Sequence, residues 1–208
     1  MREEETLGQS RIAAFSDGVF AVAITLLVLD LQVPKGSRES LPELLHAELG
    51  SYAVFVLSFV IIGIKWLNHH RMLSLIRRAD TTLMLLNLVL LLGVTVVPFT
   101  TSLLAHYLPS PDAPLAAMLY GLVWLLNGIA YTLVLWYAQR RGFTTIDPRA
   151  VSQRRMLFLY LLGPIGYAVG VALSLVNVPA AIVLYLVVVS AYVLPPPRAR
   201  RAKDGART

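Results

Sequence analysis

Six long apolar segments dominate this chain and leave it few ways to fold. Each is 17 to 25 residues long, close to the length that a helix needs to cross the hydrocarbon core of a bilayer. The segments are Ile12–Val33, Ser51–Asn68, Thr81–Ala105, Leu115–Tyr137, Met156–Leu175 and Val178–Leu194. Because backbone polar groups in lipid must find partners within the protein, we expect an all-α, polytopic integral membrane protein with six transmembrane helices.

The composition agrees with this prediction and excludes several chemistries. Of 208 residues, 57% are hydrophobic and only 14% are charged, a balance outside that of soluble domains. The sequence has no cysteine, which excludes disulfides and thiol nucleophiles, and it has no close-spaced ligand motif, so we expect neither a metal nor a cofactor. We expect residues 1–195 to form one six-helix transmembrane domain and residues 196–208 to form a basic, disordered cytoplasmic tail.

Basic residues predict the orientation of these helices. The formal net charge is +6, and the regions after the second, fourth and sixth apolar segments hold 13 of the 18 Lys and Arg residues. These regions share one side of the bilayer, so the positive-inside rule places both termini in the cytoplasm. Orientation in a plasma or inner membrane explains the cations better than nucleic-acid binding, and no nucleic-acid partner is expected.

Arg11 directly precedes the first apolar segment, and the polar residues Ser16 and Asp17 interrupt it. An ionised Asp near the bilayer centre costs roughly 2.5–3.5 kcal/mol on insertion scales, so Asp17 should face protein or water and have a partner. Alternatively, Ser16 and Asp17 cap a helix that begins near Gly18. Candidate partners at the end of the second segment are Trp66, His69 and His70.

The second segment carries further ionisable groups whose roles the sequence leaves open. Adjacent His69 and His70 suggest a metal or acid–base site, but neighbours in a helix point about 100° apart and no second ligand pair accompanies them. A structural hydrogen-bonding role, in which a histidine bonds to Asp17, is favoured over metal binding. Lys65 lies one turn from the expected cytoplasmic end, where it either snorkels to the surface or reaches Asp17.

A stripe of mainly apolar residues runs along the first helix if it advances 100° per residue. The stripe consists of Phe15, Gly18, Val22, Thr25, Leu26 and Leu29. Asp17 lies about 140° from Val22, so a helix that presents the stripe to an axis turns Asp17 toward its neighbours. Arg11 either lies on the stripe side or bends toward Asp17, and the spacing does not decide between these. On spacing alone, such a stripe is also typical of packing between helices.

Several motifs resemble the transmembrane protein 175 family, in its prokaryotic six-helix branch. The first is Arg11 with Phe15-Ser16-Asp17-Gly18 running into an apolar helix. Others are Trp66-Leu-Asn68-His69-His70-Arg71, Arg78-Ala-Asp80, Leu86-Asn87-Leu and Val97-Pro98-Phe99-Thr100. The resemblance covers roughly the first 105 residues, and only the hydropathy pattern continues beyond them.

The resemblance implies a potassium-permeable cation channel, a homotetramer in which four first helices surround the pore. It assigns the pore constriction to Val22, Leu26 and Leu29, with Thr25 lining the same passage. It assigns the bracing of the first helix to Arg11, Phe15, Ser16, Asp17 and Gly18. Val22 stands where the family has isoleucine, which predicts a slightly wider ring, and no Thr-Val-Gly-Tyr-Gly run is present to build a carbonyl filter. The expected partners are potassium ions, lipid and other copies of the chain.

A secondary transporter of a small solute or ion is the alternative function. It predicts polar substrate-binding residues near the midplane and an internal repeat, but nothing in the last three apolar segments repeats Phe-Ser-Asp-Gly. A membrane enzyme would need a convergent set of acids, bases or ligands, for which only Asp17 and the two histidines are available. We therefore expect no enzymatic activity.

Overall fold

A computed structural model describes residues 2–31, 40–145 and 152–192, with side chains described for 10–31, 40–145 and 161–192. The described parts are helical apart from turns and one isolated bridge. The helices are α1 (Arg2–Leu26), the 3-10 helix η1 (Leu27–Asp30), α2 (Leu41–Ala47), α3 (Leu49–Ser74), α4 (Thr81–Tyr107), α5 (Ala113–Arg140), α6 (Ser152–Ser174) and α7 (Val178–Ser190). The expected basic tail, residues 196–208, lies outside the described residues.

Within the described residues, four helical stretches are long and apolar enough to cross a membrane. They are Ser10–Asp30, Leu49–Ser74, Thr81–Tyr107 and Ala113–Arg140. Two shorter apolar helices, Leu161–Ser174 and Val178–Ser190, follow them. A short turn separates these two, and the Asn177 side chain ends it by accepting a hydrogen bond from the backbone of Ala180. The chain is therefore a helical membrane protein, and its described residues contain four candidate spans.

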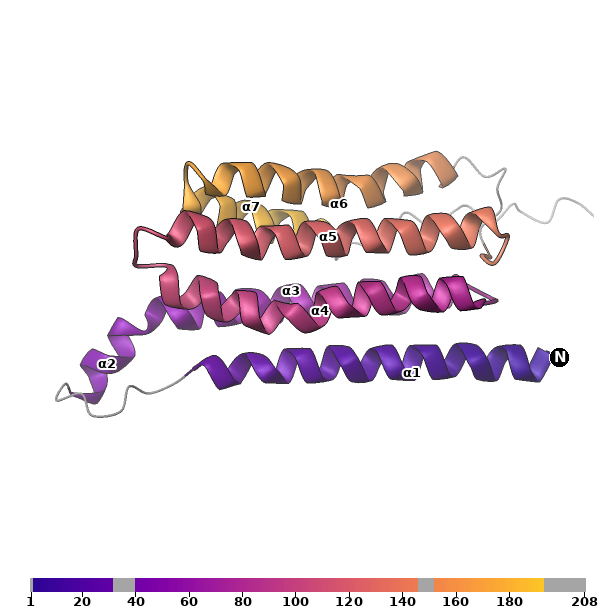
Figure 1. The fold of residues 1–208 in the computed structure, drawn as a ribbon, viewed down its shortest axis with the longest axis horizontal. Helices are drawn as coiled ribbons and strands as arrows, with labels where there is room; N and C mark the ends of the chain where they lie inside the picture. The colour runs from indigo at the N-terminus through magenta and orange to yellow at the C-terminus, as the bar shows by residue number, and fades with distance from the viewer. Residues whose placement is uncertain (1, 32–39, 146–151, 193–208) are drawn as a thin grey trace, which may run out of the picture.

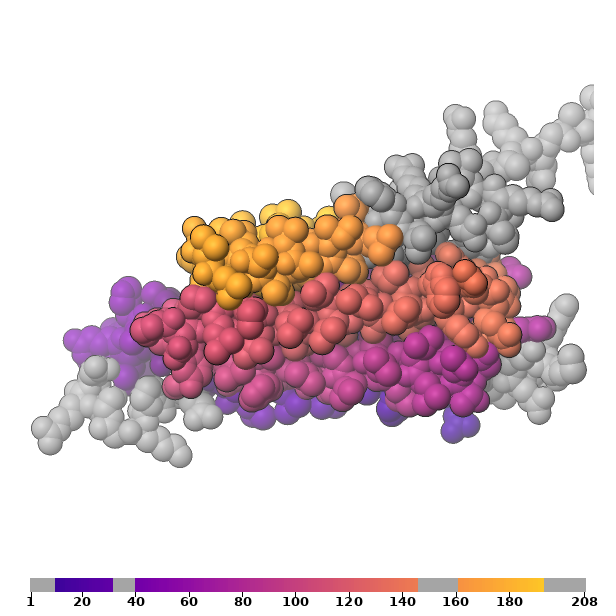
Figure 2. Space-filling view, turned by 45° about the horizontal axis from the view of Figure 1, so that its top comes forward, coloured from indigo at the N-terminus to yellow at the C-terminus, as the bar shows by residue number. Residues whose placement is uncertain are grey.

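The long helices lie side by side, and α1 runs along one edge of the bundle (Figure 1). α1 packs on α3 and α4, α4 packs on α5, and α5 packs on α6 and α7. Side chains of α4, α5 and α6 form a continuous surface, while α1 is visible only along its edge (Figure 2). The short α2 lies at the end of the bundle where α1 finishes (Figure 1). It was not predicted from the sequence, although Ser40 and Glu43 form a capping box and Pro42 follows Leu41 in its first turn.

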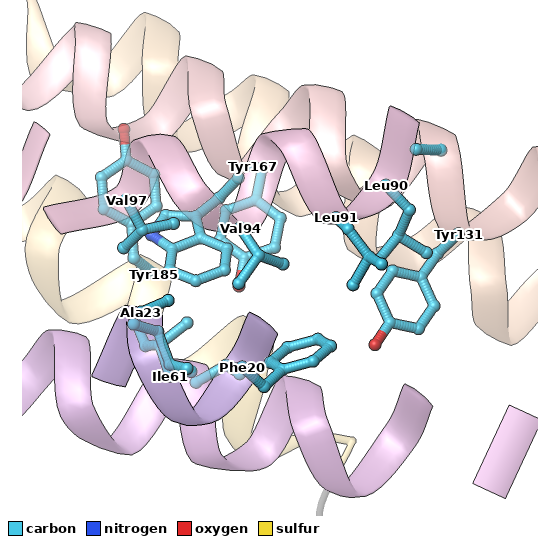
Figure 3. Close-up of a cluster of buried hydrophobic side chains, with 14 of the residues drawn as sticks. Phe20, Ala23, Ile61, Leu90, Leu91, Val94, Val97, Tyr131, Tyr167 and Tyr185 are labelled. Atoms are coloured by element: carbon cyan, nitrogen blue, oxygen red, sulfur yellow. The ribbon is translucent and has the colours of Figure 1, made fainter. Parts of the chain in front are cut away.

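One face of α1 enters the core. Phe20, Ala23 and Leu27 are buried, and Figure 3 places Phe20 and Ala23 beside Ile61 of α3 and opposite Val94 of α4. Lipid tails are as apolar as these side chains, so close van der Waals contact rather than exclusion from water holds the helices here. Apolar burial alone therefore discriminates weakly between the faces of α1.

The turn between α3 and α4 is fixed to the end of α5. Asp80 caps α4 by accepting a hydrogen bond from the backbone of Leu83 at 2.9 Å, and it also accepts one from the Tyr137 hydroxyl at 2.7 Å. Arg141 lies 3.7 Å from the same carboxylate. The Leu83 and Tyr137 hydrogen bonds, with help from Arg141, lower the pKa of Asp80. The carboxylate thus stays ionised at neutral pH and holds α3, α4 and α5 together at this end.

Aromatic rings join α5, α6 and α7 in a second part of the core. The ring of Tyr167 stacks with those of Trp124 and Tyr185, at centroid separations of 6.4 and 5.9 Å. Tyr185 reaches α5 at Gly121, where a Cβ atom would overlap the tyrosine hydroxyl. The absence of a side chain at Gly121 therefore lets α5 and α7 approach.

Replacement of Gly121 by alanine should lower the free energy of unfolding by about 1–3 kcal/mol, because the added methyl group overpacks the contact with Tyr185. Thermal unfolding in detergent would measure the loss. The matched control is Gly63→Ala on α3, where the new Cβ would meet nothing within 4 Å; it should leave stability unchanged or raise it by up to about 1 kcal/mol. Equal melting temperatures for the two variants would contradict the close α5–α7 contact.

Candidate functional site

Ser16 and Asp17 lie well inside α1, which begins at Arg2. The alternative in which they cap a helix starting near Gly18 is therefore wrong. The upstream residues extend the helix because three consecutive glutamates lie in its first turns, where negative charge is favoured by the helix dipole. Both polar side chains are thus carried by continuous helix and need partners on neighbouring helices.

Asp17 is held by Trp66. Its Oδ1 accepts a hydrogen bond from Trp66 Nε1 at 2.8 Å, which ties α1 to α3. Trp66, His69 and His70 are the candidate partners expected from the sequence, and Trp66 is the one that bonds to Asp17. The exposed His70 ring lies 6.3 Å from the Trp66 ring, and no hydrogen bond joins it to Asp17 among the described residues.

Arg11 does not pair with Asp17 in the described part of the chain. It instead lines an open groove of about 470 Å³ between α1 and α4, beside Phe15 and Leu88. The structure thus decides the alternative that the spacing left open, and Arg11 lies on the Phe15 side of α1. Its guanidinium group therefore lies at the end of the exposed stripe and takes no part in the hydrogen bond between Asp17 and Trp66 of α3.

A second, buried connection links α1 to α4 and α3. Asn87 donates a hydrogen bond from Nδ2 to Ser16 Oγ at 3.1 Å, and its Oδ1 lies 2.8 Å from His69 Nε2. Ser16 in turn donates to the carbonyl of Ile12 at 2.8 Å. Because the amide oxygen can only accept, the contact assigns the proton to His69 Nε2. His69 therefore acts as a hydrogen-bond donor toward Asn87 and does not bond directly to Asp17.

We name these residues the brace: Ser16, Asp17, Trp66, His69 and Asn87. Sequence reasoning quoted Asn87 within a motif but gave it no role. The available signal was a lone amide in an otherwise apolar helix, because such a group must find a hydrogen-bond partner in lipid. The described residues hold no cluster of three or more His, Asp or Glu side chains that would bind a metal.

The stripe residues lie on an exposed face of α1, away from the brace. Phe15 is 57% exposed, Val22 57%, Leu26 42% and Leu29 64%, and Gly18 and Thr25 are also exposed. The Thr25 hydroxyl donates to carbonyls of its own helix turn, those of Ala21 and Val22. Leu29 lies in η1, so the sequence-based angle, which assumed α-helical geometry, does not apply to it.

Lys65 takes neither of the two arrangements expected from the sequence. It is 7% exposed, so it does not snorkel to the surface, and it forms no ion pair with Asp17 among the described residues. Its ammonium group lies among aromatic rings on the side of α3 that faces α5, α6 and α7. The physical reason is that consecutive residues diverge by about 100° on a helix, so Lys65 and Trp66 face different neighbours.

These features define a helical membrane protein in which polar groups fix one helix and leave its apolar face exposed on the surface of the subunit. A family model, "Endosomal/lysosomal potassium channel TMEM175", matches residues 11–98. A potassium channel of Streptomyces collinus is 43% identical over 173 residues, covering 81% of this chain and 84% of that protein. The chain belongs to the TMEM175 family, whose members among these relatives are ion channels and not enzymes.

Two further similarities extend the comparison. The crystal structure of a lysosomal potassium-selective channel TMEM175 homologue from Chamaesiphon minutus is 36% identical, with a TM-score of 0.79 over 89% of this chain and 96% of that one. The rat protein named endosomal/lysosomal proton channel TMEM175 is 29% identical over 205 residues, which cover 93% of this chain and 39% of that longer protein. Relatives are thus named for two different ions.

Asn87→Leu should destabilise the protein by roughly 1–3 kcal/mol, because it leaves buried Ser16 and His69 without their partner. Thermal unfolding in detergent would measure this loss. Thr95→Val on the same helix is the matched control, since the exposed Thr95 hydroxyl bonds only to the carbonyl of Leu92 in its own helix. If both variants unfolded at the wild-type temperature, the polar contact would not be holding α1.

Proposed function

We propose that this protein is a potassium-permeable cation channel in which four subunits place α1 around a central pore. The observation that carries the proposal is the exposed stripe on α1, which lies opposite the helix face held by Ser16 and the buried Phe20, Ala23 and Leu27. Each subunit would contribute six membrane helices, α6 and α7 included, within a single channel domain of residues 1–195. Relatives named potassium channels support the choice of ion.

The pore constriction would consist of three stacked aliphatic rings, from Val22, Leu26 and Leu29. Such rings exclude water when they are narrow, so opening requires widening and wetting of the passage. Thr25 would be the polar group beside them, and selectivity would come from the cost of partial dehydration rather than from carbonyl ligands. Phe15 and Gly18 would continue the same face toward Arg11, whose charge would lie near one mouth of the pore.

The orientation follows from the distribution of arginines. Exposed Arg77, Arg78, Arg140 and Arg141 lie at the α3–α4 turn and the end of α5, and the start of α1 lies at this end of the bundle (Figure 1). The positive-inside rule favours this end for the cytoplasm, which would place both termini there in a plasma or inner membrane.

Ion flux into liposomes that contain the purified protein tests the channel directly. Potassium gradients should drive electrogenic uptake, and sodium gradients of equal size should drive less of it. Relatives named proton channels make the proton the second candidate, so proton uptake under the same potential is measured in parallel. Assembled protein without electrogenic flux of either ion would overturn the channel proposal.

Leu26→Ala should raise basal potassium flux several-fold, because it removes bulk from one level of the constriction and makes wetting easier. The matched control is Leu126→Ala on α5, where the leucine is 56% exposed and belongs to a helix remote from α1. Leu27 is unsuitable as a control because it is fully buried and its truncation would disturb packing. A larger flux through the Leu126 variant than through the Leu26 variant would place the pore on another face.

A further inference from the structure

A buried lysine lies among four aromatic rings within the bundle. Lys65 of α3 has its Nζ 5.9 Å from the ring centroid of Trp124, 5.3 Å from that of Tyr131, 5.2 Å from that of Tyr167 and 6.0 Å from that of Tyr192. These four aromatic residues, here called the cage, come from α5, α6 and the residue pair that follows α7. Within the described parts of the chain, no carboxylate pairs with the lysine.

The cage offers the chemistry that an ammonium group needs in place of water. A lysine inside a membrane span is costly unless it finds partners, and the negative faces of aromatic rings attract a cation within about 6 Å. A cavity of about 30 Å³ adjoins Lys65, lined also by Asn68, Tyr131 and Tyr192. It has room for a water molecule but not for a hydrated ion, so the rings are the main partners of the charge.

The cage connects directly to the brace. The Tyr131 hydroxyl donates a hydrogen bond to the backbone carbonyl of Lys65 at 2.6 Å, and the Tyr131 ring meets the His69 ring edge-on at 5.9 Å. The opposite neighbour of His69 is Phe20 of α1, at a centroid separation of 5.3 Å. Trp66, which holds Asp17, follows Lys65 in the chain. A single rotation of α3 therefore seats Lys65 in the cage and turns Trp66 and His69 toward α1.

We propose that Lys65 is a positioning residue: its caged ammonium group fixes the rotation of α3 and, through Trp66 and His69, the face that α1 presents to the pore. The inference rests on the proposed channel function for its effect on ion flux, but not for its effect on helix rotation. Loss of the charge lets α3 turn and loosens α1. Helices α5 to α7 thereby control the rotation of α1, although they make few contacts with it.

Titration adds a signature that a purely steric role would lack. The titratable groups that face Lys65 are Tyr131 of α5, Tyr167 of α6 and Tyr192, with His69 one turn away on α3 itself. Loss of the lysine proton at alkaline pH should have the same effect as Lys65→Met. Lys65→Arg keeps a positive charge beside the same tyrosines and does not lose it at alkaline pH, so the difference between Lys65→Arg and the wild type isolates the lysine proton.

The chain has no native cysteine, so single cysteines can report the rotation of α1. Ala23 is 1% exposed and Val22 is 57% exposed. A cysteine is placed at each position in turn and labelled with a water-soluble thiol reagent. The labelling ratio, Ala23→Cys divided by Val22→Cys, measures how far the buried face of α1 has turned toward the surface. Lys65→Met should raise this ratio several-fold, and Lys65→Arg, which keeps the charge, should leave it near the wild-type value. Tyr167→Phe is the matched cage control, because it keeps the ring face and should also leave the ratio unchanged.

The pH profile completes the test. From about pH 8 to about pH 12, which brackets the ordinary titration of a lysine, the wild-type ratio should rise toward the Lys65→Met value, whereas Lys65→Met should stay high and Lys65→Arg should stay low throughout. A folded Lys65→Met protein with the wild-type ratio and profile would overturn the inference. If Lys65→Met does not fold, the pH profiles of the wild type and Lys65→Arg decide. The inference would be overturned by a wild-type labelling ratio that stays constant with pH, or by one that rises equally in Lys65→Arg.

Ion flux separates this inference from the channel proposal. Changed labelling in Lys65→Met, in a protein whose wild type passes no ions, would support the positioning role and overturn the channel. If the wild-type protein passes potassium but Lys65→Met leaves the labelling ratio unchanged, the channel proposal would be supported and the positioning role of Lys65 would be overturned. When both hold, potassium flux through Lys65→Met should differ several-fold from wild type, and Lys65→Arg should restore it.

Discussion

The hydrogen bonds that join α1 to its neighbours are the interactions on which the arrangement of this protein depends. In water, an apolar helix face is buried because water excludes it, but lipid tails solvate leucine and valine as well as a protein core does. The rotation of α1 must therefore be set by groups that lipid cannot satisfy. Ser16 and Asp17 are such groups, and they accept hydrogen bonds from Asn87 and Trp66 respectively.

Because the two bonds point to different helices, they fix α1 more firmly than either would alone. Asp17 reaches α3 through Trp66, and Ser16 reaches α4 through Asn87. Ser16 and Asp17 diverge by about 100°, so together they set the rotation of α1 about its axis. The opposite stripe, from Phe15 to Leu29, consequently stays exposed on the surface of the subunit. An exposed apolar face of this kind is available either to lipid or to other copies of the chain.

The aromatic part of the bundle has a different role. α5, α6 and α7 pack through large rings and a close glycine contact, and they enclose the one lysine that α3 carries within its span. Tyr131 links this region to His69 and hence to the brace. The bundle thus consists of a peripheral aromatic unit and a braced helix, with α3 and α4 between them.

The sequence by itself determined the helical class, the approximate limits of the four long spans, the polar motif of α1 and its stripe, because helix length and the 100° repeat are local properties. It also identified Trp66 as a candidate partner. It did not determine that α1 starts at Arg2, that Asn87 joins Ser16 to His69, or that Lys65 turns away from Asp17. Each of these depends on which helix lies beside which, and a periodic pattern specifies the faces of a helix without specifying its neighbours. Only the tertiary structure brought these distant side chains within hydrogen-bonding distance.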